Sequence, residues 1–275
     1  MVLLDAGRMT DPSTSAAAAV AGAAQQLRRA TVSGTPGAPV RGLIGRDDLE
    51  AAYAVQRINI EARTAAGAVV VGRKIGLTSP AVQAQLGVDQ PDFGVLLDDM
   101  AFEDDGVIAF TSVLQPRVEA EVAFVLKDDL AEGDLDDTQV RAAIDYAVAA
   151  IEICGSRVAD WDICFSDTVA DNASAGAYVL GTERKTLAEF SPAAVTMSMS
   201  INGEEVSTGN GAACLGDPVN AVVWLARQAR ALGDPLRAGQ VILSGALGPM
   251  RAVRPGATVT VTISGLGSVS ATFSG

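Results

Sequence analysis

Three glutamates have the residue type and the spacing to hold a metal ion. Glu119 and Glu121 lie two residues apart in the alternating segment 117–126, and Glu152 stands further along, in the apolar segment 149–155. Successive side chains of a strand point to opposite faces, so Glu119 and Glu121 would lie side by side on one face. The other parity is apolar and comprises Val118, Ala120, Val122 and Phe124. We therefore predict a strand that carries two carboxylates on one face.

These two adjacent carboxylates are open to two interpretations. A half-buried strand whose polar face meets solvent is common and needs no ligand. Two neighbouring carboxylates can also bind a hard divalent cation, which relieves the repulsion that would otherwise raise their pKa values. Glu152 favours the second interpretation, because one ionised glutamate in an apolar segment is costly unless it is paired, hydrogen-bonded or bound to metal.

The overall composition narrows the possible chemistry. The chain has 275 residues, a formal net charge of −13 and no histidine. This excludes histidine-based triads and imidazole metal sites, and so much negative charge disfavours nucleic acids and membrane surfaces as partners. No apolar run is long enough to span a membrane. The cysteines Cys154, Cys164 and Cys214 lack a CxxC spacing, which predicts buried thiols in a reducing compartment such as the cytoplasm.

Three carboxylates without histidine or paired cysteine suit Mg²⁺ or Mn²⁺ rather than zinc. Coordination positions left open by the protein would admit a 2-oxo or 2-enol carboxylate, which could chelate the cation through its carboxylate and its C2 oxygen. Lys74, near the end of a predicted strand at 68–76, would place a positive charge near the same oxygens. An exposed lysine at a strand end is the ordinary alternative for Lys74.

The elements that must position these side chains form a helical N-terminal part, residues 1–66, and a β-rich catalytic part, residues 67–275. Helices are predicted from apolar periodicity and capping residues at 15–30, 47–65, 80–86, 138–150 and 218–232. Strands are predicted at 68–76, 95–99, 107–110, 117–126, 149–155, 177–181, 195–201, 204–208, 241–245, 257–263 and 268–273.

Local signals fix several of the expected boundaries. Asn202-Gly203 suits the tight turn of a hairpin, and Asp217-Pro218 suits the N-cap and first position of a helix. Thr138 or Asp137 is the expected N-cap of the helix at 138–150. Asp92 falls in the segment 88–94, whose Asp, Pro and Gly residues predict a loop on backbone grounds alone.

Roughly residues 45–275 resemble the 2-keto-4-pentenoate hydratases of the fumarylacetoacetate hydrolase superfamily, in the same order and at matching separations. The related 4-oxalocrotonate decarboxylases are also similar, but the stretches around Asp92 and Trp161 favour the hydratase branch. The matching motifs are Gly72-Arg-Lys-Ile-Gly-Leu-Thr-Ser79, Gly87-Val-Asp-Gln-Pro-Asp-Phe-Gly94, Gln115-Pro-Arg-Val-Glu-Ala-Glu121, Asp160-Trp161 with Asp167-Thr-Val-Ala-Asp-Asn-Ala-Ser174, and Leu243-Ser-Gly-Ala-Leu-Gly-Pro-Met250.

This resemblance implies an α+β fold, a mixed β-sheet roll with flanking helices and a small helical N-terminal part. It implies that Mg²⁺ or Mn²⁺ is bound by Glu119, Glu121 and Glu152. It further implies that Lys74 is the active-site lysine and that Asp92 is an acid or base. The substrate-side hydroxyls would be those of Ser174 and Ser244, the latter standing where the family more usually has threonine.

The activity implied is hydration of 2-hydroxypenta-2,4-dienoate to 4-hydroxy-2-oxopentanoate, in the meta-cleavage degradation of aromatic compounds. The expected partner is this small molecule, and relatives form homo-oligomers. Two alternatives remain. One is a metal-dependent decarboxylase of a 2-oxo-3-hexenedioate, which would need a cationic contact for the distal carboxylate. The other is a non-catalytic partner subunit, for which three clustered carboxylates would serve no purpose.

Overall fold

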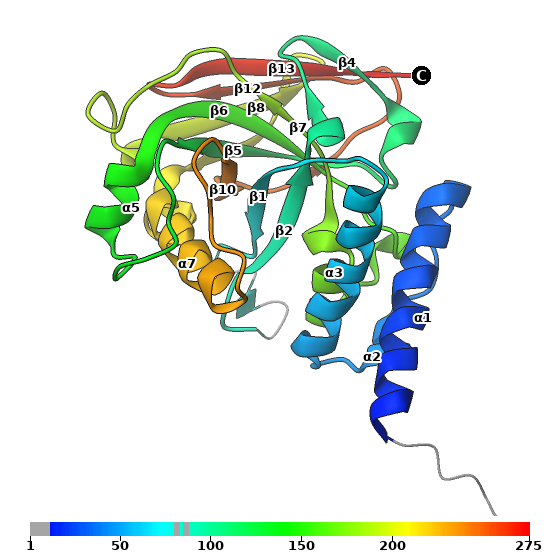
Figure 1. Cartoon of the computed structure of the whole chain (residues 1–275). Coiled ribbons are helices and arrows are strands. Elements are labelled where there is room, and N and C mark those ends of the chain that lie inside the picture. Colours follow the sequence, from blue (N-terminus) through cyan, green and yellow to red (C-terminus); the bar gives the residue numbers. More distant parts are fainter. Residues whose placement is uncertain (1–11, 80–82, 85–87) are drawn as a thin grey trace, which may run out of the picture.

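The computed structural model describes residues 12–79, 83–84 and 88–275. The predicted helix at 80–86 lies almost wholly outside the described residues. Among these, the N-terminal segment is helical and the remainder is built mainly of strands (Figure 1). The α-helices are α1 (Pro12–Ser33), α2 (Arg41–Ile44), α3 (Leu49–Ala65), α5 (Asp137–Ala143), α6 (Phe165–Ala170) and α7 (Pro218–Ala231).

The larger sheet carries the candidate site. Its strands run in the order β2-β1-β10-β5-β6-β7-β3, and β11 (Arg251–Ala252) pairs with β5 outside this path. The strands mix parallel and antiparallel neighbours, since β1 pairs with β10 in parallel and β5 pairs with β6 antiparallel. Their bounds are β1 (Val70–Gly76), β2 (Asp92–Leu97), β3 (Ala101–Phe102), β5 (Arg117–Leu126), β6 (Ile144–Cys154), β7 (Ala175–Leu180) and β10 (Val241–Ala246).

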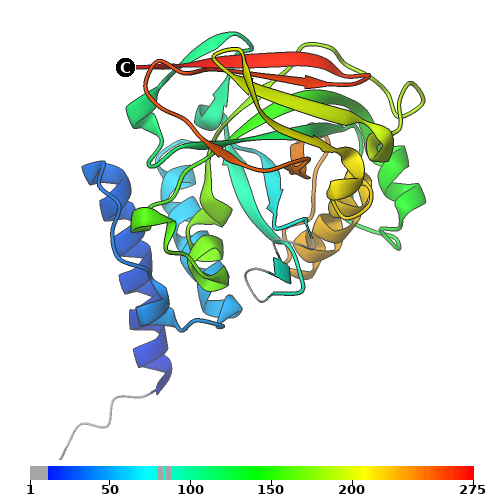
Figure 2. The same ribbon diagram turned by 180° about the vertical axis from the view of Figure 1, so that it is seen from behind.

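A smaller sheet lies over β5, β6 and β7. Its order is β4-β13-β12-β8-β9, and Figures 1 and 2 show it stacked on the larger sheet, with α1 and α3 on one side of the molecule and α7 on the other. Asn202 and Gly203 close its hairpin with positive φ at both residues, as a tight turn requires. Its strands are β4 (Gly106–Ala109), β8 (Thr196–Ile201), β9 (Glu204–Asn210), β12 (Thr258–Ile263) and β13 (Gly267–Ser274).

The main core lies between the two sheets. The apolar parity of β5 is fully buried there and packs in one cluster with residues of β12 and β13, such as Val259, Val261 and Phe273. Alternation therefore turns the opposite parity of β5, which carries Glu119 and Glu121, toward the concave side of the larger sheet. The predicted α+β class with a curled mixed sheet is confirmed, and so is the strand at 117–126.

Two predicted elements need correction. The helix expected at 138–150 ends at Ala143, and β6 begins at Ile144, because residues 144–154 pair along β5 as a long antiparallel strand. The N-cap of this helix, α5, is Asp136 and not the expected Asp137 or Thr138. The side chain of Asp136 accepts a hydrogen bond from Gln139 N. The loop expected at 88–94 ends earlier, because Asp92 pairs with Gly76 as the first residue of β2.

Asp167 connects the helical N-terminal segment to the sheet-bearing part through hydrogen bonds. Its carboxylate, fully buried, accepts hydrogen bonds from Arg41 N at 2.8 Å, from Arg41 Nη1 at 2.7 Å and from Cys164 N at 3.0 Å. Burial alone would raise the pKa of Asp167, but these donors together lower it below its ordinary value. The carboxylate is therefore structural and ionised in the folded protein.

We expect Asp167→Asn to lower the free energy of unfolding by about 3 kcal/mol, because an amide cannot accept all three hydrogen bonds. Urea denaturation at pH 7 measures this loss. Since the folded pKa is depressed, the stabilisation is present above the unfolded pKa of about 4 and is lost as the pH falls through the folded value. The difference in free energy of unfolding between wild type and variant should therefore become smaller below pH 4. A difference that does not change with pH would show that the charge of Asp167 is not involved.

Two further sequence expectations concern cysteines and membranes. Cys154, Cys164 and Cys214 are buried and free, as predicted. Within the described ranges, no helix combines the length and the apolar character needed to cross a membrane.

Candidate active site and metal centre

The strand register brings two of the predicted ligands face to face. Glu119 of β5 is the direct antiparallel partner of Glu152 of β6, and directly opposed side chains have their Cβ atoms about 5 Å apart. Glu121 stands two residues further along β5 on the same face. It is fully buried, as is Glu152, whereas Glu119 is partly exposed. Like charges placed directly opposite destabilise a sheet, so this cluster calls for a compensating cation.

Several buried oxygens of this cluster accept no hydrogen bond. Oε1 of Glu121 and both carboxylate oxygens of Glu152 have no hydrogen-bond donor among the described residues, although Glu152 Oε1 forms an ion pair with Lys74. The other oxygen of Glu121 accepts one from Gly245 N at 2.7 Å, which fixes the orientation of the carboxylate. Buried polar groups in native proteins are nearly always satisfied. Buried carboxylate oxygens left unsatisfied on neighbouring strands are suited to bind a hard divalent cation.

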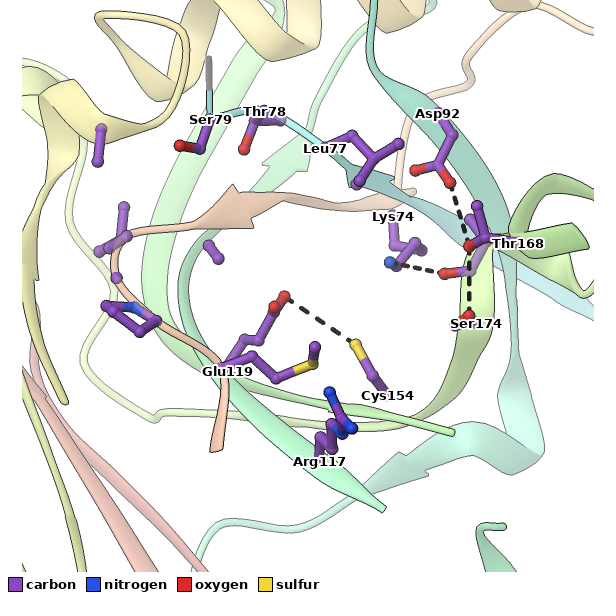
Figure 3. Close-up of a pocket in the computed structure, with 18 of the residues that line it drawn as sticks. Lys74, Leu77, Thr78, Ser79, Asp92, Arg117, Glu119, Cys154, Thr168 and Ser174 are labelled. Atoms are coloured by element: carbon purple, nitrogen blue, oxygen red, sulfur yellow. Dashed lines mark hydrogen bonds between the residues drawn. The ribbon is translucent and has the colours of Figure 1, made fainter. Parts of the chain in front are cut away.

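Lys74 reaches the same cluster from β1. Two strands, β10 and β5, separate β1 from β6, so in a flat sheet the two backbones would lie about 14 Å apart. Yet Lys74 Nζ lies 3.1 Å from Glu152 Oε1 and donates a hydrogen bond to Ala173 O at 2.8 Å. The curl of the sheet closes this distance, and Figure 3 shows Lys74 and Glu119 directed into one cavity.

Burial and mutual charge set the protonation of these groups. Burial raises the pKa of Glu119, and the charge of Glu152 raises it further, to about 7. Burial, Glu152 and Glu119 raise the pKa of Glu121 well above its usual range. Burial would lower the pKa of Lys74, but the surrounding carboxylates outweigh it and hold that pKa well above normal. Lys74 is therefore a buried ammonium at neutral pH.

Asp92 belongs to the same cavity through a chain of hydroxyls. It is buried, and its Oδ2 accepts a hydrogen bond from Thr168 Oγ1 at 3.4 Å, while Thr168 Oγ1 lies 3.2 Å from Ser174 Oγ (Figure 3). Its Oδ1 has no partner among the described residues. Burial is the main reason that the pKa of Asp92 is raised. A carboxyl group with a raised pKa and a free oxygen is suited to proton transfer.

A left-handed turn holds two of these contacts in place. Asn172, Ala173 and Ser174 have φ values of 56°, 50° and 56°, a conformation that costs non-glycine residues roughly 1–2 kcal/mol each. The side chain of Asn172 compensates by bonding both N and O of Val95, at 2.8 and 2.9 Å. The turn thereby points Ala173 O at Lys74 and Ser174 at Thr168.

Of the predicted site residues, Glu121, Glu152 and Ser244 are not among those that line the cavity, and the Ser244 hydroxyl makes no hydrogen bond to the carboxylate cluster in the described structure. Ser244 is fully buried, and its hydroxyl donates to Val122 O at 2.8 Å. Its role in substrate binding stays a prediction. The cavity of about 740 Å³ is lined by Lys74, Asp92, Glu119 and Ser174, and further by residues that the sequence analysis did not assign, chiefly Thr78, Arg117, Cys154, Trp161 and Thr168.

Cys154 also lies at the carboxylate cluster. One potential ligand atom each from Glu119, Glu152 and Cys154 lies within 4.8 Å of the others, because Cys154 follows Glu152 by two residues on the same face of β6. Burial and the charges of Glu152 and Glu119 raise the pKa of this thiol well above normal, so it carries a proton. A protonated thiol is a poor ligand for a hard cation, and carboxylate oxygens suit one better. Glu121, the third predicted ligand, does not belong to this 4.8 Å group.

The lack of a side chain at Gly76 leaves space for the carboxylate of Asp92. A Cβ atom at residue 76 would lie 2.2 Å from Asp92 Oδ1. We expect Gly76→Ala to displace the carboxylate and lower turnover at least about tenfold, at a cost in stability of roughly 1–3 kcal/mol. Gly22→Ala in α1, where no atom lies within 4 Å, is the matched control and should leave turnover unchanged. Equal activity of the two variants would mean that Asp92 need not hold this position.

Comparison with known proteins assigns the fold and site to a family. Residues 70–274 match the family model of the fumarylacetoacetate (FAA) hydrolase C-terminal domain. A solved structure, 4-oxalocrotonate decarboxylase from Pseudomonas putida G7 complexed with magnesium and adipate, superposes with a TM-score of 0.88 at 34% identity, covering 97% of this chain and all of that one. The chain belongs to the fumarylacetoacetate hydrolase family.

Similarity is higher to one group within the family. The 2-keto-4-pentenoate hydratase of Paraburkholderia xenovorans is 55% identical over 91% of this chain and 93% of its own length. The TodF product hydratase of Pseudomonas putida is 54% identical over 96% of this chain and 99% of its own length. The resemblance noted from the motifs is thus confirmed, and it extends over nearly the whole chain.

Proposed function

We propose that this chain is a divalent-metal-dependent hydro-lyase that adds water to 2-hydroxypenta-2,4-dienoate and yields 4-hydroxy-2-oxopentanoate. The observation that carries the proposal is the cluster of Glu119, Glu121 and Glu152 on paired strands, in which oxygens of Glu121 and Glu152 accept no hydrogen bond and Lys74 Nζ lies 3.1 Å from Glu152 Oε1. The choice of substrate is supported by relatives at 50–55% identity that bear the name 2-keto-4-pentenoate hydratase. The meta-cleavage degradation of aromatic compounds is the corresponding context.

The three glutamates are proposed to hold Mg²⁺ or Mn²⁺. Bound there, the cation would act as a Lewis acid toward negative charge that develops on a substrate oxygen. The protein contributes orientation, since Gly245 N fixes Glu121 and the antiparallel register fixes Glu119 against Glu152. Carboxylate oxygens are the ligands preferred by such cations, and the thiol of Cys154 beside them holds its proton because its pKa is raised.

Lys74 and Asp92 are proposed to act on charge and on protons. Ketonisation of the dienol needs a proton at the distal carbon, and hydration then needs water delivered to C4. Lys74, held as an ammonium, stabilises negative charge at the C2 oxygen without giving up its proton. Asp92 has the raised pKa and the free Oδ1 of a group that can donate and accept a proton. Thr168 and Ser174 link it to the cavity.

Assembly and location complete the proposal. We propose a homo-oligomer, as the resemblance to the hydratases implies. Light scattering of the purified protein measures the assembly. The three free, buried cysteines support a reducing compartment, the cytoplasm.

The product identifies the reaction. Purified protein is mixed with 2-hydroxypenta-2,4-dienoate in water labelled with heavy oxygen, and separately with 2-oxo-3-hexenedioate. Incorporation of the label at C4 of 4-hydroxy-2-oxopentanoate, without release of CO₂ from the dicarboxylate, is the expected result. Release of CO₂ would instead identify a decarboxylase. No change in either substrate would favour a non-catalytic partner subunit.

A further inference from the structure

One cation of the cavity has no role in the chemistry described so far. Among the described residues that line the cavity, the basic ones are Lys74 and Arg117. Lys74 is engaged by Glu152 and Ala173 O. Arg117 is partly exposed, and no carboxylate of the described chain lies within 4 Å of its guanidinium. Figure 3 shows its nitrogen atoms directed into the cavity, below Glu119 and Cys154.

Arg117 is held against an aromatic face. Its guanidinium carbon lies 4.4 Å from the ring centroid of Trp161, a stacking that fixes the plane of the group while leaving its five N–H donors at the rim available. A planar, pre-oriented fork of donors matches the two oxygens of a carboxylate. Arg117 is directed into the cavity and has no carboxylate partner among the described residues. Its guanidinium is therefore suited to bind an anion.

Trp161 is itself placed by a strained backbone. Gln115, Asp160 and Trp161 all have positive φ, 52°, 59° and 57°. Gln115 holds the arrangement: its backbone O accepts from Trp161 Nε1 at 3.1 Å, and its side-chain Oε1 accepts from Asp160 N at 2.8 Å. Its Nε2 donates to Ser156 O and Val158 O. The hydrogen bonds of Gln115 thus keep three residues, Gln115 included, in a costly backbone conformation. Such strain indicates that the position of Trp161 is maintained for function.

The strand geometry then locates the anion. Arg117, Glu119 and Glu121 follow one another at alternate positions of β5, so the guanidinium lies on the same face as the metal-ligand candidates. A carboxylate of a substrate that chelates a cation at these glutamates would lie within reach of this guanidinium. A chain with net charge −13 also needs a local cation to admit an anionic substrate.

We propose that Arg117, oriented by Trp161, binds the C1 carboxylate of the substrate. The identity of that substrate rests on the proposed function, whereas recognition of a 2-oxo acid carboxylate does not. Arg117 is a binding residue that contacts the substrate, and Trp161 is a positioning residue that acts through it.

The test compares Arg117→Gln with Arg184→Gln. Arg184 stacks in the same way on Tyr146, 4.5 Å from the ring centroid, but does not line the cavity, so it controls for the loss of a stacked arginine. We expect Arg117→Gln to raise KM for the dienoate roughly ten- to a hundredfold with a smaller change in kcat. Affinity for Mg²⁺ should be kept or increased, as for removal of any neighbouring cation, and the melting temperature should change no more than in Arg184→Gln. Arg184→Gln should behave as wild type.

Two outcomes would overturn the proposal. An unchanged KM for Arg117→Gln would show that the guanidinium does not contact the substrate. A rise in KM confined to a dicarboxylic homologue, with the monocarboxylic dienoate unaffected, would place Arg117 at the distal end instead. A wild-type protein that does not turn over the dienoate would refute the proposed function alone. In that case calorimetric binding of 2-oxopentanoate to both magnesium-loaded proteins still tests Arg117, with at least about tenfold weaker binding expected for the variant.

Discussion

Replacing Glu121 by glutamine is expected to lower metal-dependent turnover at least about a thousandfold while leaving the metal-free protein as stable as wild type or more stable. The reason is that the buried carboxylate, with Oε1 unpartnered, is costly without a cation. The glutamine oxygen can still accept the hydrogen bond from Gly245 N. A thousandfold loss corresponds to about 4 kcal/mol of transition-state stabilisation, a magnitude reasonable for one ligand of a catalytic cation.

Thermal unfolding with and without Mg²⁺ separates this effect from misfolding. Wild type should gain stability with added Mg²⁺, because a ligand that binds only the folded state raises the melting temperature. Glu121→Gln should lose that gain. Glu204→Gln, on the exposed part of β9, is the matched control and should retain both turnover and the gain. A variant that still gains stability from Mg²⁺ and still turns over substrate would remove Glu121 from the ligand set.

Replacing Lys74 by methionine is expected to have the opposite effect on metal binding. Turnover should fall by about 10²–10⁴-fold, because the only buried ammonium facing Glu152 in the described site is lost. Affinity for Mg²⁺ should be kept or increased, since Lys74 no longer repels the cation or competes for the Glu152 carboxylate. Steady-state kinetics and calorimetric titration of Mg²⁺ measure the two effects independently.

The neighbouring residue provides the control for Lys74. Arg73 is also buried, but it points to the other face of β1 and pairs with Asp234. Arg73→Met should change stability only modestly, because the largely exposed Asp234 stays solvated without its partner, and should leave kcat close to that of wild type. If Lys74→Met instead lost Mg²⁺ affinity to the same degree as Glu121→Gln, Lys74 would be a structural support of the cluster rather than a group that acts on substrate.

Local patterns accounted for much of the fold. Strand β5 and its two faces follow from strict alternation in 117–126, and the caps of α7 follow from Asp217 and Pro218, with Asp217 accepting from Val219 N as expected. The helix predicted at 138–150 was too long, because an Ala- and Val-rich run fits either periodicity. Pairing with β5 decides in favour of a strand from Ile144 onward, and such tertiary contacts are not encoded in local spacing.

The site itself was predictable as a set of residues but not as an arrangement. Alternation placed Glu119 and Glu121 together, and the cost of burying a charge singled out Glu152. The 3.1 Å contact between Lys74 and Glu152 depends on the curl of the sheet, which no segment specifies alone. The backbone at Trp161, which supports Arg117, is left-handed although no glycine stands there. The sequence therefore gives no signal for this turn, and only the structure shows this part of the site.

The central claim is tested most directly by returning metal to the stripped protein. Protein freed of metal with EDTA is mixed with freshly generated 2-hydroxypenta-2,4-dienoate, and the loss of the dienol absorbance is followed while Mg²⁺ or Mn²⁺ is titrated in. The account predicts no loss beyond the spontaneous rate without metal, and rapid, saturable recovery with it in wild type but not in Glu121→Gln. Turnover by fully stripped protein, or equal recovery in the variant, would contradict a metal-dependent hydration at the three glutamates.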